Sequence, residues 1–60
     1  MTINEIDRNM GKSVQVRDSD GDTWTITITN RSGSTLYWAH TGRLWTTQNM
    51  GHRSIFELIK

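Results

Sequence analysis

Residues 23–30, TWTITITN, decide the fold of this 60-residue chain. Trp24, Ile26 and Ile28 occupy every second position, and threonines fill the positions between them. Because successive side chains of a strand point to opposite faces, this period of two predicts a β-strand with one apolar and one polar face. Aromatic and β-branched residues also favour strands. One buried and one solvated face is the pattern of an antiparallel sheet.

The acidic stretch DSDGD, residues 18–22, lies just before this strand and just after SVQVR at 13–17, which also alternates. Asp-Gly between two alternating segments predicts a hairpin with a type I′ turn, which needs positive φ. A calcium loop fits poorly, because Thr23 and Thr29 stand where an EF-hand requires glycine and a bidentate glutamate. A catalytic acid cluster also fits poorly, because a turn tip offers solvent and no burial to tune carboxylates.

The N-terminal residues predict a short helix and its cap over residues 2–11. Thr2 and Glu5 fit the S/T-x-x-E capping box, in which both side chains accept bonds from free backbone N–H groups. Apolar residues recur with helical spacing at Ile3, Ile6 and Met10. Gly11 follows in the position of a C-terminal cap. A helix of about two turns persists only when packed, so its apolar side must lie on another element.

The second half of the chain predicts further strands. We expect, in order, a turn at residues 30–34, a strand at 35–40, a tight turn at Thr41 and Gly42, a strand at 43–47 and a loop at 48–52. Residues 54–59 fit either a strand or one helical turn, and the strand is favoured because so short a helix is weak.

Together these elements predict one mainly β domain over residues 1–60. It has the helix and cap at 2–11, followed by a four- to five-stranded antiparallel meander within 12–59. Two alternatives remain for the sheet: an SH3-like small barrel, or an open curved sheet that packs one face on the helix.

Composition limits the function. The formal charge is +1, and cysteine and proline are absent, so disulfides and thiolate metal sites are excluded. A domain this small buries only about 60% of its unfolded surface. Without disulfides or a structural metal to stabilise it, such a domain needs a partner chain. We therefore expect a homo-oligomer, with a dimer favoured. No apolar run approaches the ~20 residues of a membrane span, and the N-terminus lacks a secretory pattern. We therefore expect a cytoplasmic protein with no membrane contact.

The sequence predicts no enzymatic activity, no cofactor and no metal. There is no cysteine nucleophile, and His40 and His52 support neither a Ser-His-Asp arrangement nor an ordinary zinc site. No glycine-rich phosphate loop precedes a helix.

The aromatic residues suggest a binding surface. Trp24 and Trp38 share a strand face with other apolar residues and are assigned to the core. Tyr37 and Trp45 fall on the opposite face, where they form either a partner surface or a second core or dimer seam. The candidate partner-binding residues are Tyr37, Arg43 and Trp45, with an acidic rim of Asp18, Asp20 and Asp22. An acidic rim steers binding toward a basic, nucleic-acid-binding partner.

The layout of GKSVQVRDSDGDTWTITITN, TLYWAHTGRLW and GHRSIFELIK resembles the small single-domain accessory proteins of bacteriophages. In those proteins a GK opens a meander, a W…GR hairpin follows, and an apolar ending closes the sheet. The resemblance implies a protein of the bacterial host cytoplasm that binds and inhibits a host protein, such as a defence or nucleic-acid-processing complex. The alternatives are a single-stranded nucleic-acid-binding small barrel and an oligomer that captures a nucleotide signal.

Overall fold

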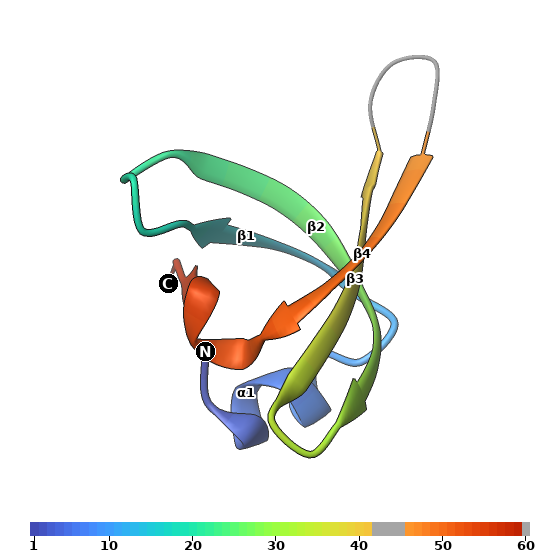
Figure 1. The fold of residues 1–60 in the computed structure, drawn as a ribbon. Coiled ribbons are helices and arrows are strands. Elements are labelled where there is room, and N and C mark those ends of the chain that lie inside the picture. The colour runs from blue at the N-terminus through green and yellow to red at the C-terminus, as the bar shows by residue number, and fades with distance from the viewer. Residues whose placement is uncertain (42–45, 60) are drawn as a thin grey trace.

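The computed structural model describes residues 1–41 and 46–59 (Figure 1). Its elements are α1 (Ile3–Arg8), β1 (Ser13–Arg17), β2 (Thr23–Ser32), β3 (Thr35–Thr41), β4 (Thr46–His52), the 3-10 turn η1 (Arg53–Ile55) and β5 (Glu57–Leu58). All paired strands are antiparallel, and they form one five-stranded sheet in the order β4-β3-β2-β1-β5. The predicted short helix followed by an antiparallel sheet is confirmed.

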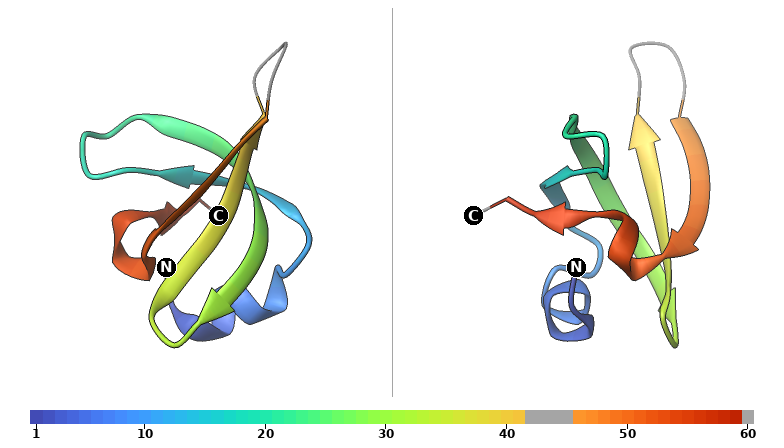
Figure 2. Two further views of the ribbon diagram at one scale, coloured as in Figure 1. Left: turned by 45° about the vertical axis from the view of Figure 1, so that its right-hand side comes forward. Right: turned by 60° about the vertical axis from the view of Figure 1, so that its left-hand side comes forward.

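The sheet is curved and open, with β4 and β5 as its two edges (Figure 2). Within the described residues these edge strands do not pair, so the sheet is not closed into a barrel. Of the two sheet alternatives, the open curved sheet is correct. Its curvature gives the protein a concave side, where the core lies, and a convex side without a covering layer among the described residues.

One core joins the sheet to the helix. Its fully buried side chains come from α1 and from three strands, namely Ile6, Val16, Ile26, Ile28 and Leu36. Met1, Trp38 and Phe56 complete the same cluster, with 9%, 9% and 6% of their surface exposed. The alternation of apolar and polar residues therefore predicted the buried face of β1, β2 and β3 correctly.

The helix begins as predicted and ends earlier. Thr2 Oγ1 accepts a bond from the backbone of Glu5 at 3.1 Å, and Glu5 Oε1 accepts one from the backbone of Thr2 at 2.8 Å, which completes the capping box. Asn9 ends α1, and its side chain donates to the Glu5 carbonyl oxygen at 2.8 Å. Met10 therefore lies beyond the helix and is exposed, so the expected apolar side contributes only Ile6 to the core.

The β1–β2 turn is not of type I′. That turn needs positive φ at two central residues, but the described residues have positive φ only at glycines, here Gly21 with φ 88°. Gly21 N donates to the Asp18 carbonyl oxygen at 3.1 Å, and Asp18 N donates to the Asp22 carbonyl oxygen at 2.9 Å. The Asp18 side chain supplies further turn contacts, because its Oδ1 accepts bonds from the backbone N–H groups of Asp20 and Asp22.

The fourth strand extends further along the chain than predicted. β4 begins at Thr46, and residues 48–52, expected to be a loop, pair with residues 35–39 of β3. These residues show no apolar alternation, so the neighbouring strand and not the local pattern determines their structure. The tight turn expected at Thr41 and Gly42 and the first part of the predicted strand fall on residues 42–45, outside the described residues.

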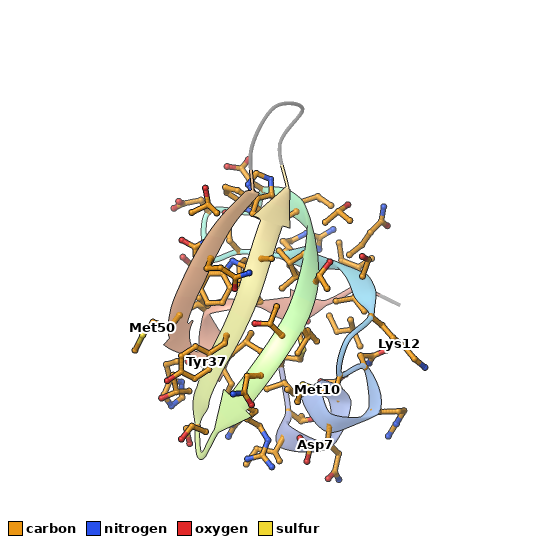
Figure 3. All side chains as sticks on the ribbon, turned by 90° about the vertical axis from the view of Figure 1, so that its right-hand side faces the viewer. Asp7, Met10, Lys12, Tyr37 and Met50 are labelled. Carbon is orange, nitrogen blue, oxygen red and sulfur yellow. The ribbon has the colours of Figure 1, made fainter. Side chains whose placement is uncertain are left out.

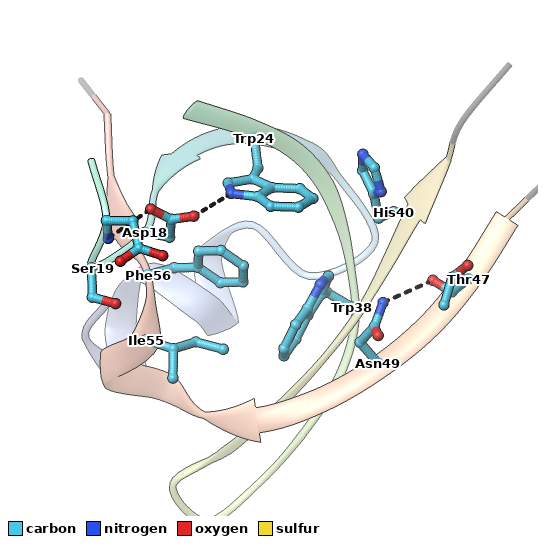
Figure 4. Close-up of a pocket in the computed structure, with 10 residues that line it drawn as sticks. Asp18, Ser19, Trp24, Trp38, His40, Thr47, Asn49, Ile55 and Phe56 are labelled. Carbon is cyan, nitrogen blue, oxygen red and sulfur yellow. Dashed lines mark hydrogen bonds between the residues drawn. The ribbon is translucent and has the colours of Figure 1, made fainter. Parts of the chain in front are cut away.

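The C-terminal segment combines both alternatives considered for residues 54–59. The 3-10 turn η1 occupies its first part, and the two-residue strand β5 follows. β5 pairs with β1 through Val16↔Leu58 and Arg17↔Glu57. Phe56 lies between η1 and β5, and this position directs its ring into the core from the side opposite β3 (Figure 4).

Candidate functional site

The concave side of the sheet holds a cavity of about 490 Å³ (Figure 4). Four aromatic side chains line it and define what we call the aromatic pocket: Trp24, Trp38, His40 and Phe56. The β1–β2 turn forms one side of the pocket, and β4 forms the other through Thr47 and Asn49. A pocket of this size accommodates a side chain or a small ligand.

The four rings contact one another in two pairs. Trp24 and His40 meet edge to face with 4.8 Å between ring centroids and an interplanar angle of 75°. Trp38 and Phe56 do the same at 5.0 Å and 84°. Aromatic pairs in this arrangement contribute roughly 0.5–1.5 kcal/mol beyond their buried area. Ring contacts therefore hold the pocket walls in place.

Strand register explains why these rings share a face. Trp38 lies opposite Asn49, and His40 lies opposite Thr47, so all four residues belong to the concave side of β3 and β4. Gly51 leaves space beside Trp38 on the same face. A Cβ atom there would lie 3.1 Å from Ile55 Cδ1 and 3.4 Å from Trp38 Cη2.

Asp18 connects the turn to the pocket. Its Oδ2 accepts a hydrogen bond from Trp24 Nε1 at 2.6 Å. Its Oδ1 accepts bonds from the backbone N–H groups of Asp20 and Asp22, each at 2.9 Å. The bond from Trp24, assisted by backbone N–H groups, lowers the pKa of Asp18 against an opposing contribution from desolvation. The carboxylate is therefore charged at neutral pH and orients the indole ring.

Asp20 presents a second carboxylate at the pocket. It lines the pocket and is exposed, and its side chain makes no hydrogen bond or ion pair within residues 1–41 and 46–59. Asp22 is exposed as well but does not line the pocket. The predicted acidic rim is thus divided: the Asp18 side chain is bonded within the fold, Asp20 lines the cavity without a side-chain bond among the described residues, and Asp22 does not line it.

The other predicted binding residues do not join this site. Tyr37 is half-buried on the convex face, where it lies opposite Met50 on β4 (Figure 3). Met50 has 64% of its surface exposed. The structure therefore places Tyr37 and the acidic turn on different sides of the sheet. Arg43 and Trp45 fall outside the described residues.

Sequence reasoning missed the aromatic pocket. Trp24 and Trp38 were assigned to the core, and Trp38 does belong to it, whereas Trp24 is only half-buried. The shared face of Trp24, Trp38 and His40 was visible in the alternation and was the available signal. The approach of Phe56 was not visible, because it depends on η1.

Comparisons of the chain with protein-family models, with curated proteins and with solved structures gave no match. In the part of the chain that the structure describes, no helix has the length and apolar character needed to cross a bilayer. The described residues also contain no group of three or more histidine, aspartate or glutamate side chains arranged to hold a metal ion. The pocket is therefore the structural feature that bears on function.

Proposed function

We propose that this chain is a non-enzymatic binding module that holds a segment of another protein in the aromatic pocket. The observation that supports this is the pocket itself, with its four aromatic side chains and a free carboxylate at its side. Aromatic residues are enriched where proteins bind one another most tightly. A pocket whose rings already contact one another loses little conformational entropy when it is filled.

The charge of the pocket favours a protein over a nucleic acid or a nucleotide. Asp18 and Asp20 place negative charge at the pocket, which repels the phosphates of a nucleotide or nucleic acid, and phosphate contacts dominate nucleic-acid affinity. No arginine or lysine among the described residues lines the pocket. Arg31 is instead ion-paired with Asp7, at 2.7 Å between Nε and Oδ1.

The resemblance to bacteriophage accessory proteins supports a narrower proposal. The partner would be a protein of a bacterial host, and binding in the host cytoplasm would inhibit it. A defence or nucleic-acid-processing complex is the partner class that fits, because such proteins present basic surfaces that an acidic pocket complements.

A display library of random peptides is first selected for binding to the wild-type protein, to test whether the pocket binds protein segments. Peptide affinity is then measured on two variants of β4, Thr47→Tyr and Gln48→Tyr. Both residues are exposed and adjacent, but Thr47 lines the pocket and Gln48 lies on the convex face opposite Ala39. Tyrosine is well tolerated in strands, so both variants should fold.

We expect Thr47→Tyr to weaken peptide binding roughly tenfold by filling the pocket mouth, and Gln48→Tyr to leave it unchanged. Loss of binding in Gln48→Tyr alone would place the binding surface on the convex face. Tight binding of a labelled oligonucleotide that weakens steeply with salt and is blocked by Thr47→Tyr would instead favour the single-strand-binding alternative.

A further inference from the structure

We infer that the aromatic pocket selects an arginine side chain of its partner, an inference that rests on the function proposed above. The pocket combines two carboxylates with two indole rings, those of Trp24 and Trp38. Indole faces attract cations, and carboxylates pair with them. No arginine or lysine of the described residues lines the pocket, so no permanently charged cation from that part of the chain balances this negative charge.

The two carboxylates have different roles. Asp18 already accepts three hydrogen bonds, from Trp24 Nε1 and from the backbone of Asp20 and Asp22. Asp20 accepts none at its side chain within the described residues. Both of its oxygens can therefore accept hydrogen bonds from a ligand. Asp18 contributes negative charge and fixes the conformation of the turn and the orientation of the Trp24 ring.

The open carboxylate of Asp20 favours a guanidinium over an ammonium group. A guanidinium presents two parallel N–H groups to the two oxygens of a carboxylate, and its plane stacks on aromatic rings. Lysine offers a compact, strongly hydrated charge that gains less from either contact. The Asp20 backbone N–H is held by Asp18 Oδ1 at 2.9 Å, so the turn is fixed before the ligand arrives.

A titration of the ¹⁵N-labelled protein with Nα-acetyl-arginine amide tests this directly. Two control compounds separate shape from charge. Nα-acetyl-citrulline amide is neutral but has nearly the same shape, and Nα-acetyl-lysine amide has the positive charge but lacks the planar guanidinium group. We expect the arginine compound to shift the indole N–H signals of Trp24 and Trp38. We expect citrulline to bind roughly tenfold more weakly, because it lacks the charge-assisted hydrogen bonds. Equal binding of citrulline, or tighter binding of lysine, would overturn the inference.

A matched pair of turn variants tests the role of Asp20. Asp20→Asn and Asp22→Asn remove the same charge from exposed positions of the same turn, but only Asp20 lines the pocket. We expect Asp20→Asn to weaken binding of the arginine compound roughly fivefold or more, and Asp22→Asn to leave it within about twofold. Equal losses in the two variants would show general electrostatic attraction and contradict a specific pair.

Peptides from the display selection distinguish this inference from the proposed function. If Thr47→Tyr weakens a selected peptide but replacing its arginines by citrulline does not, the pocket binds protein segments and the arginine inference is wrong. If no selected peptide is sensitive to Thr47→Tyr, the proposed function is wrong, and the titration with arginine amide still decides whether the pocket takes a guanidinium.

Discussion

Trp24 Nε1 donates a hydrogen bond of 2.6 Å to the Asp18 carboxylate, six residues earlier in the chain. The other oxygen of that carboxylate accepts two backbone N–H groups of the β1–β2 turn. A single side chain therefore maintains both the conformation of the turn and the orientation of a pocket ring. A change at Asp18 should disturb the two together.

Asp18→Ala should lower the melting temperature and disorder the pocket. The variant leaves the turn N–H groups and the Trp24 indole N–H without their acceptor, and unmade hydrogen bonds are costly. Thermal unfolding by circular dichroism measures the first effect, and the position of the Trp24 indole N–H signal measures the second. Asp22→Ala is the control, because its exposed side chain makes no bond within the described residues. Equal melting temperatures for the two variants would show that the Asp18 contacts add nothing.

Stability should fall in acid because two carboxylates have lowered pKa values in the folded chain. The hydrogen bond from Trp24 lowers the pKa of Asp18, and the bond from Arg31 lowers the pKa of Asp7. A group whose folded pKa is lowered adds stability above its unfolded value, about 4 for aspartate. That stability is lost as the pH falls through the lowered folded value. Urea unfolding should therefore show a decrease in the free energy of unfolding below about pH 4.

Asparagine variants test which groups cause this acid dependence. Asp18→Asn and Asp7→Asn should each flatten it, because neither variant has a carboxyl group to protonate at that position. Asp22→Asn should retain the wild-type slope, since no bond within the described residues depends on its charge. Wild-type slopes in all three variants would show that other groups control acid unfolding.

Removal of one fully buried isoleucine should unfold the domain. Ile26 has only 1% of its surface exposed and lies in the middle of the core. Substitution by alanine at such a position costs about 2–5 kcal/mol. A domain below 70–80 residues rarely has more than about 3–5 kcal/mol in total. We expect Ile26→Ala to lose the sheet signal in circular dichroism at room temperature, whereas Ile3→Ala, at a position that is 37% exposed, should fold. A cooperative transition in Ile26→Ala close to that of wild type would contradict this.

The alternation of apolar and polar residues correctly predicted the strands that have one face in the core. Ile26 and Ile28 are buried as expected, because a shift by one residue would place both in solvent. β4 could not be located in this way. Met50 is its only apolar residue, and the strand conformation of β4 depends on pairing with β3, for example Ala39↔Gln48. Such pairing involves residues distant in sequence and leaves no local pattern.

The site was less predictable than the fold for a related reason. The acidic turn was identified from DSDGD, but the bond from Trp24 to Asp18 depends on the geometry of a turn that was assigned to the wrong type. Phe56 reaches Trp38 only because η1 redirects the chain after β4. Tyr37 was placed on the correct face, yet nothing in the alternation showed that the other face would leave a cavity.

Gly51→Val should disturb the pocket more than Gly51→Ala. A Cβ atom at Gly51 meets the flexible end of Ile55, which is partly exposed and can move by a few tenths of an ångström. The two further methyl groups of valine approach the Trp38 ring as well, and overpacking of this kind costs about 1–3 kcal/mol. We expect near-wild-type unfolding for alanine, and for valine a lower melting temperature with a changed near-ultraviolet tryptophan spectrum. Identical spectra for the two variants would indicate that the space between Gly51, Ile55 and Trp38 is larger than these distances imply.

Self-association should depend on Tyr37, if the convex face is where two copies meet. Tyr37 and Met50 form a cross-strand apolar pair there, and the small core favours a partner that covers it. We expect wild-type protein to sediment as a dimer. Tyr37→Ala should sediment as a folded monomer, because the half-buried ring lies outside the core cluster. Thr47→Ala changes the opposite face of the sheet and should remain dimeric. Two results would rule out this surface as the dimer interface. One is a wild-type protein that is monomeric at all concentrations, and the other is a Tyr37→Ala variant that dimerises as strongly as wild type.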